Sequence, residues 1–499
     1  MPGELNMAWT RKANCGGNPA NSAGRFAAAV VLFPERVGVA SNTDSLREEL
    51  AMRNLIRTLL RRFPAFALTM SGFLIATVRA EEPAASEHPL IVHEWGTFTS
   101  FSGSDGIQLD FRPLVDNDLP AFVYSPSSLN PFTKRQIFAR QRMETPVTYF
   151  YSDVERDVKV SVKFPGGKLT EYYPPPLPSP QLQVFLAQEE SEKLLETIDW
   201  GTVHVIPEKT LATHVLNPEV ASRVNRHISM GLVPWLDEGN PYYEARHTDS
   251  ALLYVRRTAE EGQAYTTAAA DFQGDHFEKF LFYRGAGSFT LPVTVASLSA
   301  DRVKVKNLSP GDIHGVFVVH NNGQLMRYRS AGTLSGSGEM EVTLPDWSEL
   351  PNTNPIQELD QKIVEALIAE GLYEKEARAM VKTWKSSWYN EPGYRVFFLV
   401  PQVITDSILP LTIEPQPQET LRVLVARMEF MTPEDEKHLL TLMRDSAVAS
   451  DPGRENLLQD LKLRGRLAEP AILHVAKLSG DPAVQAEAET VRGLLLKGL

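Results

Sequence analysis

Apolar and polar residues alternate with a period of two in two long parts of the chain. The first part runs from Ile91 to Tyr173, and the second runs from Phe277 to Leu344. This period is typical of strands that bury one face. Pro165-Gly166-Gly167 and Asn321-Asn322-Gly323 interrupt the alternation, and the second sequence is typical of a tight hairpin turn. The pattern therefore predicts antiparallel strands that pack as a sandwich.

A helical spacing of apolar residues replaces the strand pattern after residue 353. Asn354 is a suitable cap and Pro355 a suitable first residue for a helix that Gly371 ends. Its apolar stripe consists of Ile356, Leu359, Ile363 and Leu367. A second stripe of the same spacing reaches Trp388, so residues 354–388 are predicted to form an αα-hairpin. Two strands are expected to return the chain to a sheet before residue 430.

Residues 431–499 have the pattern of an all-helical tail. Thr432-Pro433-Glu434-Asp435 resembles a capping box, and Asp451-Pro452 and Asp481-Pro482 mark two further helix starts. The last part of the tail resembles a single HEAT-type helical repeat. Because one repeat cannot bury its own apolar face, the tail is expected to dock on the rest of the chain or on a partner.

Together these patterns predict an α+β fold. It consists of a β-rich body of antiparallel, sandwich-like sheets, an inserted αα-hairpin and a helical tail. The proline-rich segment 174–180 cannot lie inside a sheet and is predicted to be an extended connector. The predicted domains are a β domain over 81–180, a mixed α/β and then sandwich-like domain over 181–430, and the tail over 431–499.

The start of the chain has a different character. Residues 52–80 begin with a segment that contains four arginines, which an apolar stretch from Phe63 to Val78 and a small-residue site that ends at Ala80 follow. This is the layout of a secretory signal peptide, and its apolar stretch is shorter than the ~20 residues of a membrane span. We expect cleavage after Ala80, a periplasmic or secreted location and no stable membrane span. An uncleaved anchor is the alternative, and residues 1–51 are interpreted as an over-extended start.

The net charge and the cysteine content exclude some classes of partner and of catalytic chemistry. The formal charge of -12 argues against nucleic acid as a partner, because nucleic-acid binding usually needs a basic surface. The only cysteine, Cys15, precedes the predicted cleavage site. The exported chain would therefore have neither disulfides nor thiolate chemistry.

The segment from Pro89 to Gly103 places a histidine, a carboxylate and a tryptophan side by side. As a strand it has Val92 and Glu94 on one face and His93 and Trp95 on the other, and large apolar groups on both faces predict a central strand. A buried carboxylate without a partner is costly, so Glu94 is expected to pair with an arginine. The alternative is a catalytic role for His93 or Glu94.

Candidate metal ligands occur further along the chain. His247 and Asp249 form one group, and Asp275 and His276 form another. Such pairs occur in metal sites and also in ordinary loops. The chain contains no His-Glu-x-x-His motif, no nucleophile elbow and no phosphate-binding loop, and the sequence identifies no cofactor.

Five segments in a fixed order carry a family resemblance. They are VHEWGTFTS, FPGGKLTEYYP, KFLFYRG, WYNEPGYRVFFLVP and ILPLTIEP. Together they resemble an uncharacterised family of exported bacterial proteins whose hallmark is His-Glu-Trp-Gly-Thr near the mature N-terminus. The resemblance spans most of residues 88–430. It implies export and one shared architecture, and it implies no particular activity.

Two functions follow from these observations. The first is an exported cell-envelope protein of unknown biochemical activity that binds or scaffolds a partner, either a protein or a cell-surface polymer. The second is a metal-assisted hydrolase in which His93 or Glu94 acts with groups from 244–278 on an activated water. The lack of a catalytic motif favours the first hypothesis.

Overall fold

The computed structural model describes residues 88–112, 138–177, 196–213, 218–229, 242–258, 274–350, 355–448 and 451–498. They all belong to one compact unit, Pro83–Leu499. The predicted signal peptide over 52–80 and its cleavage site lie outside the described residues. No helix in the described ranges combines the length and the apolar character that crossing a bilayer requires.

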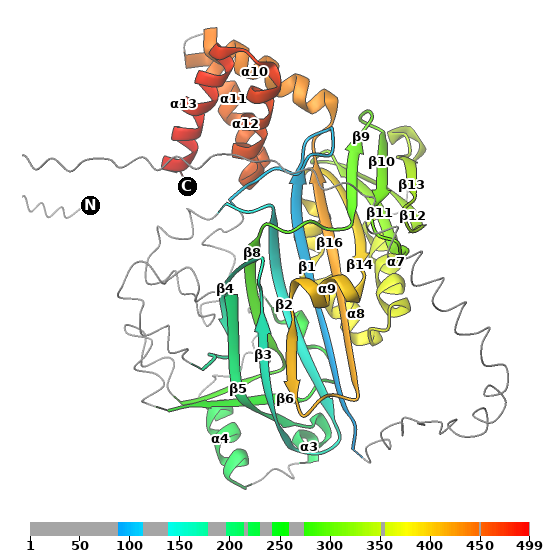
Figure 1. The fold of residues 1–499 in the computed structure, drawn as a ribbon, viewed down its shortest axis with the longest axis vertical. Coiled ribbons are helices and arrows are strands. Elements are labelled where there is room, and N and C mark those ends of the chain that lie inside the picture. Colours follow the sequence, from blue (N-terminus) through cyan, green and yellow to red (C-terminus); the bar gives the residue numbers. More distant parts are fainter. Residues whose placement is uncertain are drawn as a thin grey trace, which may run out of the picture. The chain divides into compact units, whose positions relative to one another are not determined.

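The largest sheet of this unit has eight strands in the order β12-β11-β14-β16-β1-β2-β8-β4 (Figure 1). The strands are β1 (Leu90–Ser102), β2 (Gln141–Ser152), β4 (Gly167–Tyr173), β8 (Leu281–Gly287), β11 (Ile313–Asn321), β12 (Met326–Leu334), β14 (Gly393–Val400) and β16 (Glu419–Phe430). Neighbouring strands are antiparallel except β1 and β16, which run parallel. The central position predicted for β1 is confirmed, since β2 and β16 flank it.

Two smaller antiparallel sheets pack on one face of the large sheet. The five-stranded sheet consists of β15 (Leu411–Glu414), β3 (Arg156–Lys163), β5 (Thr197–Ile206), β6 (Leu252–Arg257) and β7 (Gly274–Glu278), and the three-stranded sheet consists of β13 (Glu339–Thr343), β10 (Arg302–Asn307) and β9 (Val293–Ser297). One apolar core joins the three sheets. It includes Val92 and Phe150 from the large sheet, Val160 and Val203 from the five-stranded sheet, and Val305 from the three-stranded sheet.

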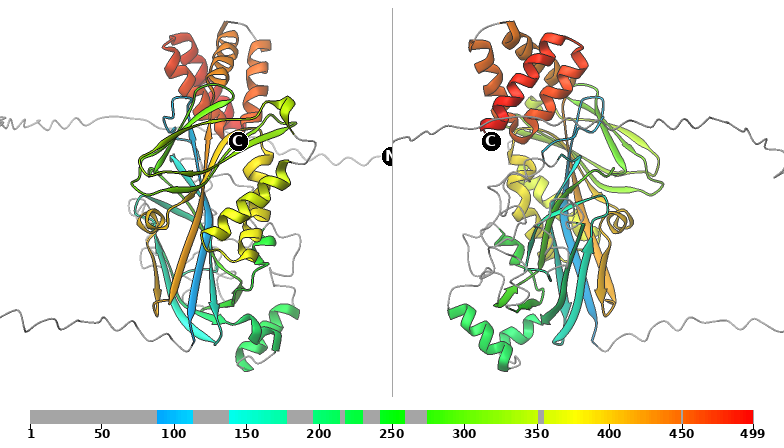
Figure 2. Two further views of the ribbon diagram at one scale, coloured as in Figure 1. Left: turned by 90° about the vertical axis from the view of Figure 1, so that its right-hand side faces the viewer. Right: turned by 60° about the vertical axis from the view of Figure 1, so that its left-hand side comes forward.

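Helices cover the opposite face of the large sheet (Figure 2). The predicted αα-hairpin is confirmed as α7 (Pro355–Ala369) and α8 (Glu374–Lys385), which the π-helical turn η7 (Ser386–Asn390) follows. Leu359 and Leu367 of the predicted stripe are buried against a core that includes Trp95 of β1 and Phe397 of β14. The α+β fold class is therefore confirmed, with a β sandwich and a helical layer.

The turn between β11 and β12 forms where the sequence predicts a hairpin. The two strands pair in antiparallel register up to Asn321, and Gly323 has a φ of 91°. This left-handed conformation favours glycine over residues with a side chain. The side chain of Asn321 accepts a hydrogen bond from the Gly323 amide at 2.7 Å.

The helical tail docks on the body of the same chain. Its helices are α10 (Pro433–Val448), α11 (Asp451–Arg464), η8 (Gly465–Leu467), α12 (Ala468–Ser479) and α13 (Pro482–Gly498). Their apolar core also takes in Phe101 of β1. In addition, the amide and the hydroxyl of Ser104 each donate a hydrogen bond to Glu436, at 2.8 Å.

The boundary predicted near residue 180 does not divide the body into two folding units. β4, which precedes it, pairs with β8, and β3 pairs with β5. A reading of local patterns misses these pairings because the strands are far apart in the sequence. The other helices in the part of the chain that the structure describes are α3 (Glu208–Thr213), α4 (Pro218–Ser229), η5 (Glu244–Arg246), η6 (Trp347–Glu349) and α9 (Gln402–Ile408).

Candidate functional site

Charged residues replace apolar ones at one end of the large sheet, on the face that α7 and α8 cover further along. The register pairs Thr99 of β1 with Arg427 of β16, and it pairs Glu429 with Arg395 of β14. Paired residues on neighbouring strands point to the same side of a sheet, so these four share one face. The next residue of β14 on this face, Phe397, already belongs to the apolar core.

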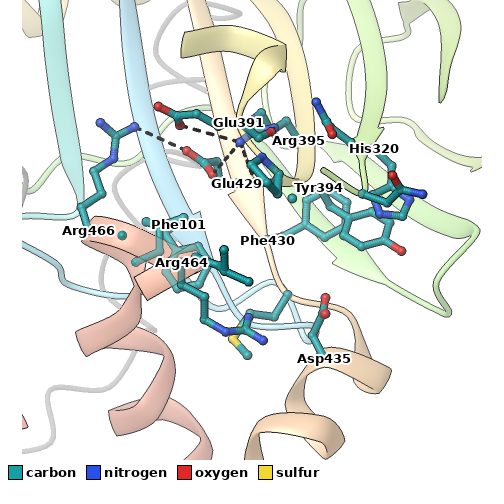
Figure 3. Close-up of a pocket in the computed structure, with 18 of the residues that line it drawn as sticks. Phe101, His320, Glu391, Tyr394, Arg395, Glu429, Phe430, Asp435, Arg464 and Arg466 are labelled. Atoms are coloured by element: carbon teal, nitrogen blue, oxygen red, sulfur yellow. Dashed lines mark hydrogen bonds and ion pairs between the residues drawn. The ribbon is translucent and has the colours of Figure 1, made fainter. Parts of the chain in front are cut away.

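Three arginines converge on Glu429 at this end of the sheet, and Figure 3 shows two of them, Arg395 and Arg466. The Glu429 carboxylate lies 2.7 Å from Nη2 of Arg427, 3.5 Å from Nη2 of Arg395 and 3.4 Å from Nη2 of Arg466. A second carboxylate, that of Glu391, lies 2.9 Å from Nη2 of Arg427 and 3.8 Å from Nη2 of Arg395. Arg395 and Arg427 are fully buried, whereas the Glu391 side chain is 57% exposed.

The charged groups of this cluster and their burial shift the pKa values of Glu429 and Arg395. Burial alone would raise the pKa of Glu429, but Arg427, Arg395 and Arg466 outweigh burial and hold it below the usual value. Burial lowers the pKa of Arg395 to about 10, even though Glu429 opposes this shift. At neutral pH Glu429 is therefore ionised and Arg395 is protonated.

A cleft of about 580 Å³ lies between this end of the sheet and the helical tail. Residues from the ends of β1, β11, β14 and β16 line one side, and residues from α10, α11 and η8 line the other (Figure 3). The lining includes Phe101, His320, Tyr394, Arg395, Glu429 and Arg466. This volume lies within the range of small-molecule sites, which combine apolar walls with a few placed polar groups.

Stacked rings form the aromatic wall of the cleft. The Tyr394 ring lies on the His320 imidazole with a centroid distance of 3.7 Å and an interplanar angle of 16°, and Phe430 lies 5.6 Å from Tyr394. The Arg327 Nε donates a hydrogen bond to Nδ1 of His320 at 3.2 Å. Burial, and then the charge of Arg327, lower the pKa of His320 to about 3. His320 is therefore neutral at neutral pH and adds no charge to this wall.

Glu94 lies on the other face of β1 and has the arginine partner that the sequence predicts. Nε and Nη2 of Arg422 lie 2.7 Å and 2.6 Å from the Glu94 carboxylate, and both side chains are buried. Thr148 and Tyr283 donate hydrogen bonds to Glu94 at 2.9 Å and 2.8 Å. The predicted pairing of Glu94 is confirmed, and its contacts are those of a structural ion pair that joins β1 to β16.

His93 has a separate environment from Glu94. Its Nδ1 lies 2.8 Å from Oε2 of Glu376 in α8, and Tyr151 donates a hydrogen bond to the other oxygen of this carboxylate at 2.8 Å. The Nε2 atom of His93 is buried and has no hydrogen-bond partner among the described residues. His93 does not line the cleft, and it does not share a site with Glu94 because the two side chains occupy opposite faces of β1.

The structure does not bring the four candidate metal ligands together. Three of them form ion pairs, which are His247–Glu244, Asp249–Lys375 and Asp275–Arg223. The fourth, His276, is buried on β7, where its ring contacts Tyr173 at a centroid distance of 6.0 Å. Within the ranges that the structure describes, no group of three or more His, Cys, Asp or Glu side chains is arranged to hold a metal ion.

The cleft is not predictable from the sequence. Its charged residues come from separate segments, and only the strand register and the docked tail bring them together. A weak indication is present in the sequence, because GYRVFFLVP and LRVLVARMEFM carry Arg395, Arg427 and Glu429 within otherwise apolar strands. Charged residues at such positions need partners, although their spacing does not name those partners.

Comparisons with known proteins identify no family for this chain. No protein-family model matches it, and no curated protein matches it. Among solved structures, the yeast delta-COP-I mu-homology domain is 7% identical, with a TM-score of 0.23, and the match covers 69% of this chain and 98% of that one. The same domain complexed with a Dsl1 WxWxV peptide is 8% identical, with a TM-score of 0.22, and the match covers 69% and 96%. TM-scores this low carry no argument about function.

Proposed function

We propose that this protein is an exported cell-envelope protein whose function is binding, and that the cleft between the large sheet and the helical tail holds its partner. The observation that carries the proposal is the composition of this cleft. Buried guanidinium and carboxylate groups meet aromatic rings in one space of about 580 Å³. The signal-like segment 52–80 supports export, and the net charge of -12 favours a partner other than nucleic acid.

The chemistry of the cleft suits recognition better than catalysis. Arg395 and Glu429 hold each other in fixed ionised states, and His320 is neutral inside a ring stack. A general acid or base works best when its pKa is near the operating pH, and none of these three groups meets that condition. Fixed charges beside aromatic rings are typical of sites that bind and orient a ligand.

An exposed leucine at the cleft provides a direct test of this proposal. Leu463 lines the cleft and is 76% exposed. Replacing Leu463 with glutamate is expected to weaken binding to the washed cell-envelope fraction about tenfold, because the change puts a charge where a partner would bury an apolar side chain. Co-sedimentation of the purified protein with this fraction measures the binding.

Leu478 provides the matched control for this experiment. It is also an exposed leucine of the helical tail, 57% exposed, but it lies on α12 and does not line the cleft. Leu478→Glu is expected to bind like the wild type, and both variants are expected to melt within a few degrees of it, because both positions are exposed. Equal binding by Leu463→Glu and wild type would contradict the proposal, as would equal losses in the two variants.

A further inference from the structure

Arg395 and Arg427 lack sufficient negative charge within the buried part of their cluster. Both side chains are fully buried, and Glu429 is the buried carboxylate that they share. Glu429 also pairs with Arg466. A second buried carboxylate, that of Glu144, lies 3.4 Å from Arg466 and 3.5 Å from Arg142, so two buried negative charges face four guanidinium groups. Two buried cations need more than a shared partner, because an unpaired buried charge is strongly destabilising. The additional negative charge comes from Glu391, whose side chain is 57% exposed.

Hydrogen-bonding capacity remains unused in the same two arginines. Nε of Arg395, and Nε and Nη1 of Arg427, are buried without a hydrogen-bond partner among the residues that the structure describes. Buried polar groups in native proteins are almost always hydrogen-bonded, so these atoms are donors that a bound group can satisfy. Arg395 lines the cleft, whereas Arg427 does not and is connected to it through Glu391, a lining residue that lies 2.9 Å from its Nη2.

The Glu391 side chain is free to leave while its backbone stays in place. Nη1 of Arg395 donates a hydrogen bond to the Glu391 carbonyl at 2.7 Å, and Nη2 donates one to the Pro392 carbonyl at 3.0 Å. These two bonds fix the segment between η7 and β14. The Glu391 side chain is 57% exposed, so it can turn into solvent once another anion takes over its place beside the two buried arginines. A carboxylate from a ligand can therefore take its place on Arg427 and Arg395.

The rest of the cleft favours one negative charge next to an apolar group. Asp435 also lines the cleft and disfavours a polyanion, whereas the lining residue Asp460 is paired with Arg464 at 2.6 Å. The neutral ring stack of Tyr394 on His320, with Phe430 beside it, offers an apolar surface in the same space. A planar carboxylate also matches the fork of N–H donors in a guanidinium group.

We infer that the cleft binds a ligand through a single carboxylate next to an aromatic group, as at the carboxyl end of a peptide. The ligand carboxylate displaces the Glu391 side chain from Arg427 and Arg395, and its ring packs on Tyr394. This inference deepens the proposed function and rests on it. Glu391 acts as an internal competitor, so its removal strengthens ligand binding.

Titration calorimetry with N-acetyl-phenylalanine tests the inference on the full chain. N-acetyl-phenylalanine amide lacks the negative charge and is otherwise the same probe. The acid is expected to bind wild type weakly and Glu391→Gln about five- to tenfold more tightly, because glutamine does not compete as an anion. The amide is expected not to bind to either protein. Glu339→Gln is the matched control, because Glu339 is 55% exposed, pairs with Lys304 and lies outside the cleft.

Three results would overturn the inference. They are equal binding of the acid and the amide, an affinity for the acid that Glu391→Gln leaves unchanged, and tighter binding of phenyl phosphate than of the acid.

Failure of this inference is distinguishable from failure of the proposed function. If Leu463→Glu abolishes envelope binding while the acid and the amide bind alike, the proposed binding function is supported and recognition of a ligand carboxylate is contradicted. If envelope binding does not depend on Leu463 while Glu391→Gln strengthens binding of the acid, the carboxylate site is supported and the proposed binding function is contradicted.

Discussion

Replacing Arg422 with methionine is expected to lower the free energy of unfolding by about 3–5 kcal/mol. The variant leaves the carboxylate of Glu94 buried without a cation, and Thr148 and Tyr283 supply only neutral donors to it. Methionine fills much of the volume of arginine, so the loss reports the charge more than a cavity. Urea denaturation at neutral pH, followed by circular dichroism, measures the change.

An exposed ion pair on the three-stranded sheet provides the control for this experiment. Arg302 and Glu341 lie 2.8 Å apart, with side chains 53% and 46% exposed. Arg302→Met is expected to cost less than about 1 kcal/mol, because solvent competes for both charges. A loss in Arg422→Met no larger than the loss in Arg302→Met would show that burial does not make the Glu94 pair important.

The sequence indicates that Glu94 needs an arginine partner, but it does not indicate which arginine this is. Apolar residues on both faces of β1 place Glu94 in a core, and a buried carboxylate requires a cation. The partner, Arg422, is 328 residues away in the sequence and directly opposite Glu94 in the parallel register of β1 and β16. No local pattern encodes a pairing between strands that are so far apart.

Elements that depend on short-range spacing were predicted more fully. The stripe around Leu359 and Ile363 identified α7, and Asn322-Gly323 identified the turn between β11 and β12. The cleft depends instead on the register of several strands and on the docked tail. Arg466, which comes from η8, illustrates this, because its sequence neighbours give no indication that it reaches Glu429.

The two buried charge clusters lie on opposite faces of the same pair of strands. Glu94 and Arg422 face the sandwich core, whereas Arg427 and Glu429 face the polar end of the helix-covered side. In the first cluster every partner of the Glu94 carboxylate is buried, and Arg422 also contacts the half-exposed Asp406 at 2.9 Å. The second reaches the cleft and is completed by the exposed Glu391. The two clusters therefore differ in their access to the cleft, which Arg395, Glu391 and Glu429 line and Glu94 and Arg422 do not.

Replacing Glu429 with glutamine is expected to lower the free energy of unfolding by about 3–5 kcal/mol at neutral pH. The change removes the buried carboxylate that Arg395, Arg427 and Arg466 share, which leaves Arg395 and Arg427 with only the half-exposed Glu391 and Arg466 with Glu144 as anionic partners. Urea denaturation measures the loss. Glu339→Gln, a change at an exposed position paired with Lys304, is the control and is expected to leave stability unchanged.

The dependence of this loss on pH identifies its electrostatic origin. The pKa of Glu429 in the folded protein lies below the usual value of 4.5, which approximates the unfolded chain. A lowered pKa contributes stability that is fully present above the unfolded value and disappears as the pH falls through the folded value. The stability gap between wild type and Glu429→Gln is therefore expected to be constant above about pH 5 and to shrink in more acidic solution. A gap that stays constant into acid would show that glutamine disturbs packing, and that the charge of Glu429 does not hold the three arginines.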